Sequence, residues 1–395
     1  MTVWSQLVGQ DDAIDVLSAA ADSAAAIVSG EDLGGGGMTH AWLFTGPPGS
    51  GRSVAARAFA AALQCEYGTG CGECAACHTA LGGTHADVRL VEPEGLSISV
   101  AEMRELVQAS ARRPATGRWR VVIIADADRL TEGAGNALLK AVEEPPERSV
   151  FLLCAPSDHP EDVSVTIRSR CRAVALRTPP AASIAEVLRS RDGIPDEMAR
   201  WAASVCGGHV GRARRLATDT SARQRREAVL RIPLGLRQPS EVFVCADDLI
   251  KSAEADANEV SEARDDAEQE ELRTAMGGGG TGKGTVAAKR AADAAVRRLA
   301  QRQKSRATRT QRDALDLALV DLAGFYRDVL VHASGSAGTL THPDRAQDVA
   351  TAAWEWTPES TLRRLEAVLA CRDAIDVNVK PRIAVEAMVT ALHHG

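Results

Sequence analysis

Short apolar runs alternate with helical patterns between Leu43 and Val174. The clearest runs are His40–Thr45, Val121–Ala125 and Val150–Ala155. Each is too short for a free-standing helix and is bounded by glycine, proline or charged residues, as buried parallel strands are. Strands that alternate with helices predict a parallel sheet flanked by helices. We therefore expect an α/β fold in this part of the chain.

The pattern changes after Pro179 and Pro180, where Ala, Leu and Arg recur at helical spacing. The rest of the chain is therefore predicted to be helical. Acids predominate in 247–271, Gly277–Gly280 follows, and a basic run extends over 283–312. This segment is typical of two solvated helices or of a partly disordered excursion. An arm that touches DNA is the alternative.

Composition limits the possible classes of protein. A chain of 395 residues suggests two or three domains. With 45% hydrophobic and 25% charged residues, it is neither wholly disordered nor fibrous. The formal net charge of −7 argues against a protein that coats nucleic acid over its whole surface. No apolar run is long enough for a membrane span, and the N-terminal segment Met1–Asp15 carries acids rather than a basic head followed by an apolar stretch. We therefore expect a cytoplasmic protein.

A glycine-rich loop follows the first predicted strand. It comprises Gly46, Pro47, Pro48, Gly49, Ser50, Gly51, Arg52 and Ser53. In the pattern G-x-x-x-x-G-K-[S/T], backbone N–H groups and a helix N-terminus surround a phosphate, the lysine reaches the outer phosphates, and the hydroxyl binds Mg²⁺. Here Arg52 replaces the lysine, and a planar guanidinium does not simply replace an ammonium. The prediction is a degenerate phosphate loop formed by Gly46, Gly49, Gly51, Arg52 and Ser53. Whether it holds ATP or ADP stays open, and a glycine turn before a core helix is the alternative.

The carboxylates expected at a nucleotide-hydrolysing site are also altered. The strand that ends at Ile124 is followed by Ala125, Asp126, Ala127 and Asp128. In such sites one acid holds the metal ion and a glutamate beside it orients the attacking water. If Ala125 stands at the position of the first acid, Asp126 stands at the position of the glutamate, and its side chain is one methylene shorter. Alternatively, Asp126 and Asp128 only begin and cap the next helix. A second glycine loop, Gly277–Gly284, keeps a lysine. However, no apolar strand precedes it and Gly284 rather than Ser or Thr follows the lysine, which argues against a phosphate site.

Four cysteines lie close together in the pattern C-x5-C-x2-C-x2-C: Cys65, Cys71, Cys74 and Cys77. Thiolates at this spacing can surround Zn²⁺ in a tetrahedron and leave no open position, so the predicted site is structural. Free core cysteines are the alternative. Cys74–His78 also matches a haem-attachment pattern, which the lack of an export signal disfavours. The other five cysteines are predicted to be packing residues.

Several segments together resemble one family. They are Val8–Gln10, His40–Phe44, the cysteine cluster, Asn136–Pro146 and Ser169-Arg170-Cys171. The chain resembles delta-prime-type subunits of the bacterial DNA polymerase III clamp loader, within the AAA+ family. The resemblance covers about residues 5–215, and Val379–Glu386 is similar to the C-terminal collar helices of the same family.

The resemblance implies roles for two arginines. Arg170 would be an arginine finger given in trans to the nucleotide site of a neighbouring subunit, and Arg212 a possible sensor arginine in the lid. The alternatives are that Arg170 pairs with an acid of its own domain, and that Arg212 is a surface residue at a helix start. The implied partners are gamma/tau and delta-type subunits, with the sliding clamp and primed DNA reached through the complex and no membrane. This places the chain in the nucleoid-associated replisome.

The expected architecture has three parts. Residues 1–178 form a RecA-like AAA+ domain, a parallel sheet with helices on both faces and an inserted zinc loop, 65–77. A helical lid over 179–235 precedes an all-α collar over 236–395, with the low-complexity excursion in 250–312. The expected function is that of a non-hydrolysing clamp-loader subunit. An autonomous ATPase that uses Arg52 and Asp126, or a zinc-dependent DNA-binding module, would be alternatives.

Overall fold

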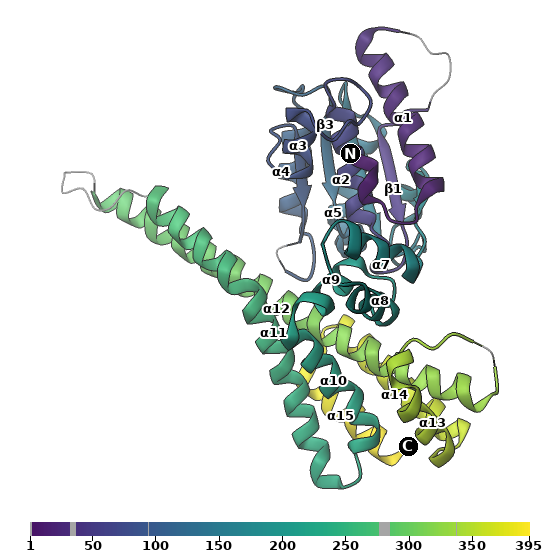
Figure 1. The fold of residues 1–395 in the computed structure, drawn as a ribbon. Coiled ribbons are helices and arrows are strands. Elements are labelled where there is room, and N and C mark those ends of the chain that lie inside the picture. Colours follow the sequence, from purple (N-terminus) through teal and green to yellow (C-terminus); the bar gives the residue numbers. More distant parts are fainter. Residues whose placement is uncertain (1, 32–36, 94, 276–284, 337) are drawn as a thin grey trace. The chain divides into compact units, whose positions relative to one another are not determined.

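The computed structural model describes residues 2–31, 37–93, 95–275, 285–336 and 338–395. The chain forms two compact units, Met1–Thr218 and Asp219–Gly395 (Figure 1). The predicted boundaries of the lid and the collar, at 178/179 and 235/236, remain predictions. The glycine hinge Gly277–Gly280 and the second glycine loop Gly277–Gly284 lie outside the described residues.

A parallel sheet lies at the centre of the N-terminal unit. In the described residues it has five strands in the order β2-β3-β4-β1-β5. The strands are β1 (Ala41–Thr45), β2 (Val88–Val91), β3 (Arg120–Ile124), β4 (Ser149–Ala155) and β5 (Arg172–Ala175). All neighbouring pairs are parallel. The three predicted strands are confirmed as the central ones, whereas the edge strands β2 and β5 were not singled out in the sequence.

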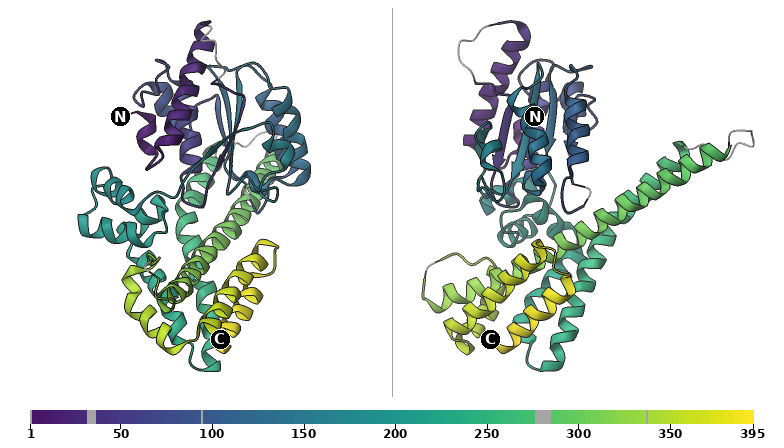
Figure 2. Two further views of the ribbon diagram at one scale, coloured as in Figure 1. Left: turned by 90° about the vertical axis from the view of Figure 1, so that its right-hand side faces the viewer. Right: turned by 180° about the vertical axis from the view of Figure 1, so that it is seen from behind.

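Helices cover both faces of this sheet, as predicted. Trp42 and Phe44 of β1 pack with α1 (Asp11–Ser29) and α2 (Arg52–Gln64) on one face. Leu43, between them, packs with α4 (Val100–Ser110) and α5 (Glu132–Glu143) on the other. Successive strand residues point to opposite faces, which explains why β1 is apolar throughout. The two helical layers lie on either side of the sheet in Figure 2.

Short helices complete the N-terminal unit. Those that lie among or before the strands are η1 (Val3–Gln6), α3 (Ala75–Leu81), η2 (Ala127–Arg129) and α6 (Val165–Arg168). Those that follow the sheet are α7 (Ala181–Ser190), α8 (Asp196–Val205) and α9 (Val210–Thr218). The helical pattern predicted after Pro180 is therefore confirmed, and the α/β part of this unit carries the candidate site.

The described part of the C-terminal unit is all helical, as predicted. Its elements are α10 (Thr220–Gly235), α11 (Pro239–Ala275), α12 (Thr285–Ala333), η3 (Pro343–Arg345), α13 (Ala346–Glu355), α14 (Pro358–Asp376) and α15 (Pro381–His394). Its core is apolar and includes Phe325 and Tyr326 of α12 and Val385 of α15, all fully buried. No described helix is sufficiently long and apolar to serve as a membrane span.

The acidic and basic segments lie in α11 and α12, which run side by side (Figures 1 and 2). Arg306 of α12 donates hydrogen bonds to Glu268 of α11 at 2.7 and 2.9 Å and also pairs with Asp265. Farther along, Gln311 donates to Glu254 at 3.0 Å. Opposite charges on the two helices therefore stabilise the hairpin, although pairs of this kind each contribute little where they are exposed.

Candidate functional site

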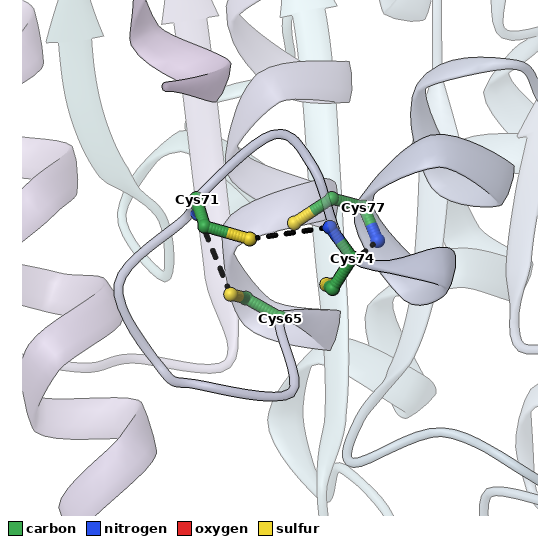
Figure 3. A group of neighbouring side chains, drawn as sticks. All are labelled: Cys65, Cys71, Cys74 and Cys77. Carbon is green, nitrogen blue, oxygen red and sulfur yellow. Dashed lines mark hydrogen bonds between the residues drawn. The ribbon is translucent and has the colours of Figure 1, made fainter. Parts of the chain in front are cut away.

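The four cysteines of the predicted cluster converge where α2 ends, in the loop that follows it and in the first turn of α3 (Figure 3). Their Sγ atoms all lie within 4.8 Å of one another. Cys65, Cys74 and Cys77 are buried, and Cys71 is half-buried. In a tetrahedral site with Zn–S bonds of about 2.3 Å, sulfur atoms lie roughly 4 Å apart. The cluster is therefore compact enough to bind a metal ion through four sulfurs.

Backbone N–H groups point at the sulfurs of this loop. The N–H groups of Cys71, Cys74 and Cys77 donate to the Sγ atoms of Cys65, Cys71 and Cys74 at 3.3–3.4 Å. Burial opposes ionisation of Cys65, but backbone N–H donors outweigh it and lower the pKa of this thiol to about 6. Burial raises the pKa of Cys77. Sulfurs turned inward and surrounded by N–H donors fit a thiolate ligand set.

The N-terminal helix η1 holds the cysteine loop in place. The Val3 N–H donates to the Gly70 carbonyl at 3.0 Å, and both Val3 and Trp4 are buried. Gly70 has a φ of +63°, and a Cβ there would lie 2.9 Å from Cγ2 of Val3. Glycine is therefore required at this position both by the left-handed backbone and by the close approach of η1.

The phosphate loop lies where the sequence predicts it, between β1 and α2. Gly49 and Gly51 have φ values of +88° and +92°, and α2 begins at Arg52. A Cβ at Gly49 would lie 2.6 Å from Cβ of His209, which immediately precedes α9. The first N–H groups of α2 have no acceptor within the helix. The loop thus retains the backbone form of an anion site, with His209 packed against it, a residue that the sequence did not single out.

The side chain of Arg52 turns back onto its own loop. Its Nη1 donates a hydrogen bond to the Gly46 carbonyl at 2.9 Å. The hydroxyl of Ser50, 2% exposed, has no hydrogen-bond partner among the described residues. One N–H group of the loop's cation is therefore bonded to a backbone carbonyl, at the position where a lysine would reach a phosphate.

Gln10 joins the phosphate loop to the segment that follows β5. Its buried side-chain amide donates to the carbonyls of Ser50 at 3.1 Å and Arg177 at 2.6 Å. Its Oε1 accepts from the Arg177 N–H at 3.1 Å. Gln10 of the motif Val8–Gln10 therefore has a structural role that the sequence did not reveal: its side chain links the phosphate loop to the segment after β5 by hydrogen bonds.

The altered acids follow β3. Asp126 occupies the N-cap position of η2, and Asp128 lies within this short 3-10 helix. Burial raises the pKa of Asp128, and the charge of Asp126 acts in the same direction, whereas the charges of Arg129 and Arg52 oppose it. Arg52 and the two acids thus share one electrostatic environment at the carboxyl end of the central strands.

The two predicted arginines lie in different surroundings. Arg170 follows α6 and forms an ion pair with Glu143, the last residue of α5, at 2.6 Å between Nη2 and Oε1. The Arg170 side chain is 37% exposed, so it pairs within its own domain and is also accessible. Arg212 lies in the first turn of α9, and its N–H donates to Nδ1 of His209 at 3.2 Å. The finger role of Arg170 in trans and the sensor role of Arg212 both stay predictions.

Comparison with known proteins places the domain that carries this site. Residues 28–180 match the family model described as "DNA polymerase III, delta subunit". Over these residues, the chain is similar to the DNA polymerase III delta-subunit family. The matched range includes the phosphate loop, the cysteine cluster and Arg170. The resemblance found in the sequence is confirmed: the matched part of the chain is similar to delta'-type subunits of DNA polymerase III.

Several known proteins are similar to this chain or to parts of it. The chain is 35% identical to DNA polymerase III subunit delta' of Pseudomonas aeruginosa over 205 residues, which are 50% of this chain and 62% of that protein. It is 39% identical to subunit tau of Bacillus subtilis over 139 residues, 34% of this chain and 24% of that one. The chain thus spans less than two thirds of the length of these relatives. A gamma-subunit-related protein of Thermotoga maritima aligns with 95% of this chain and 99% of its own, at 14% identity and a TM-score of 0.42.

Proposed function

We propose that this chain is a clamp-loader subunit that does not hydrolyse ATP itself. It would instead supply an arginine side chain to the nucleotide site of a neighbouring subunit that does. The observation that carries the proposal is the hydrogen bond from Arg52 to the Gly46 carbonyl. It places a guanidinium across the loop where the reaction needs a lysine free to reach the phosphates. Ala125, in place of an acid, also weakens the means of holding a metal ion.

Arg170 is the group that this subunit would donate. Its side chain, the middle one of the Ser-Arg-Cys motif, is 37% exposed and offers a planar fork of N–H donors. A guanidinium that crosses an interface stabilises charge on the transferred phosphoryl group and raises the rate by about 10³ to 10⁵. The partners would be gamma/tau-type and delta-type subunits, with the sliding clamp and primed DNA reached through the complex. The site of action would be the cytoplasm.

Zinc would have a structural role in this function. The four sulfurs of the cluster are protein ligands that match a closed tetrahedral site, and a closed site leaves no position for substrate. We infer that bound Zn²⁺ stabilises the loop 65–77 and, through η1, the N-terminal segment of the domain.

The experiment is ATP turnover by the purified chain, alone and after mixing with gamma/tau-type subunits. The proposal predicts a negligible rate for the chain alone and a higher rate in the mixture than for the partners alone. An autonomous ATPase that uses Arg52 and Asp126 would turn over ATP by itself, and that result would contradict the proposal.

A further inference from the structure

Glu143 and Arg170 connect two sequence motifs through one ion pair. Glu143 lies at the end of α5, in the segment Asn136–Pro146, and Arg170 lies in the Ser-Arg-Cys segment. We propose that Glu143 is a positioning residue for Arg170, which holds the guanidinium in the orientation that it needs to reach a neighbouring subunit's nucleotide. This inference rests on the proposed function of Arg170.

The carboxylate comes from a firmly packed element. Leu138 and Val142 of α5 are fully buried against the sheet, and Val142 directly precedes Glu143. A negative charge at the C-terminal end of a helix is disfavoured by the helix dipole. A nearby cation offsets this cost, and Arg170 supplies one at 2.6 Å. The position of Glu143 is therefore set by the sheet, and its charge is compensated by the arginine that it orients.

The other edge of the guanidinium is held by the segment around α6. Nη1 of Arg170 donates to the Thr166 carbonyl at 2.9 Å and to Oγ of Ser169 at 3.2 Å. Ile167 between these residues is buried in the same core as α5. Contacts on both Nη atoms restrict a long side chain that would otherwise sample many rotamers. A guanidinium has five N–H donors, so groups remain that can bind a phosphate oxygen.

This arrangement predicts a specific kinetic effect. An arginine already held in place loses less conformational freedom when the transition state forms, so the benefit appears in kcat. Removal of the carboxylate leaves the guanidinium charged but less ordered. Because the pair is about half exposed, the expected loss is modest, at most about fivefold.

The test uses the full chain in a complex with gamma/tau-type subunits whose own finger arginine has been replaced, so that the measured turnover comes from the site that Arg170 serves. Glu143→Ala should lower kcat about three- to fivefold and leave KM unchanged. Glu143→Gln should recover part of the loss, because its amide oxygen still accepts a hydrogen bond. Glu144→Ala changes the exposed neighbour and should leave kcat unaltered.

A double-mutant cycle identifies the route of the effect. If Glu143 acts through Arg170, Glu143→Ala should have no further effect in an Arg170→Ala background. The same fold-decrease in both backgrounds, or an unchanged kcat in the single variant, would overturn the inference while Arg170 keeps its role. A lowered affinity for the partner subunits would also overturn it, because that marks a structural role. If Arg170→Ala itself had no effect, the proposed function would fail.

Discussion

The Arg52 guanidinium binds the carbonyl of Gly46, six residues earlier in the same loop, at 2.9 Å. The loop that begins at Gly46 and the helix that begins at Arg52 form the frame of a phosphate site. The contact draws the Arg52 side chain back onto the loop itself. Under the proposed function, this contact opposes nucleotide hydrolysis in a loop that has the backbone form of a nucleotide site.

Arg52→Lys should strengthen nucleotide binding. An ammonium is more compact than a guanidinium and reaches the outer phosphates as a point charge. A hydrogen bond to a charged group contributes about 1.5–3 kcal/mol, so we expect affinity for ADP to rise roughly tenfold or more. Isothermal titration calorimetry would measure this, with Arg52→Ala as the control that lacks a cation. Equal affinity of the wild type and Arg52→Lys would contradict this role of Arg52.

The cysteine cluster should retain about one zinc ion per chain when the protein is purified without added metal. Cys74→Ser should lose most of this metal and lower the melting temperature of the N-terminal unit by roughly 5–10 °C. Cys245→Ser, a half-buried cysteine outside the cluster, is the matched control and should keep full metal content. Elemental analysis of the wild type, Cys74→Ser and Cys245→Ser would measure the zinc content per chain. A wild-type value near zero would leave the four thiols as core residues.

Gln10→Ala should loosen the phosphate loop. The substitution removes the hydrogen bonds that join Gln10 to Ser50 and Arg177. At about 1 kcal/mol for each lost bond, amide exchange in residues 46–53 should speed up about fivefold if only the bond to Ser50 holds the loop, and up to about 160-fold if all three bonds do. Gln347→Ala changes a glutamine on the exposed surface of α13 and should leave this exchange unaltered. Hydrogen exchange that is equal in all three proteins would show that Gln10 is not a brace.

A buried polar network in the C-terminal unit should make this unit sensitive to acid. Arg226 donates to both carboxylate oxygens of Asp344, at 2.6 and 2.9 Å, and to Nδ1 of His342 at 2.9 Å. Since arginine only donates, Nδ1 is the acceptor and the His342 proton lies on Nε2, which donates to the Asp321 carbonyl at 3.0 Å. Burial is the main cause that lowers the pKa of His342, and the charge of Arg226 adds to it. The network therefore requires a neutral histidine.

The direction of the pH effect follows from these shifts. Burial disfavours the Asp344 carboxylate, but Arg226 outweighs it and holds its pKa below the ordinary value. For both His342 and Asp344, the unfolded state binds protons more readily, so the free energy of unfolding falls as the pH drops. The loss begins near pH 6.5 through His342 and continues below about pH 4 through Asp344, at about 1.4 kcal/mol per pKa unit. Hydrogen exchange in α10 of the full chain should show it, and His342→Gln should remove the first step. An unchanged profile in this variant would contradict the assignment.

The central strands could be predicted because their apolar runs are continuous. β1, β3 and β4 are buried on both faces, so their sequences carry a clear signal. The edge strands are shorter and partly exposed: β5 has one buried residue, Val174, and β2 has one, Val88. Their sequences resemble ordinary loops, and only pairing with β1 and β3 identifies them as strands.

The features of the candidate site also fall into those that the sequence predicted and those that it did not. The cysteine spacing predicted the cluster because all four ligands lie within one short loop. The contact of Arg52 with Gly46 was not predicted, because the loop pattern does not specify which way a long side chain turns. The partners Glu143 and Gln10 were missed because they lie far in sequence from Arg170 and Ser50, and nothing in a single sequence couples them. These contacts depend on how the helices pack on the sheet.

The most direct measurement is pre-steady-state ATP hydrolysis by the reconstituted complex with wild-type chain or with Arg170→Ala. We predict that one nucleotide site, the one that Arg170 reaches, hydrolyses ATP about 10³-fold or more slowly in the complex with Arg170→Ala. The fast phase of that complex should therefore lose the amplitude of this one site. The remaining sites should react as before. A fast phase with the same amplitude and rate in both complexes would show that Arg170 gives nothing to its neighbour.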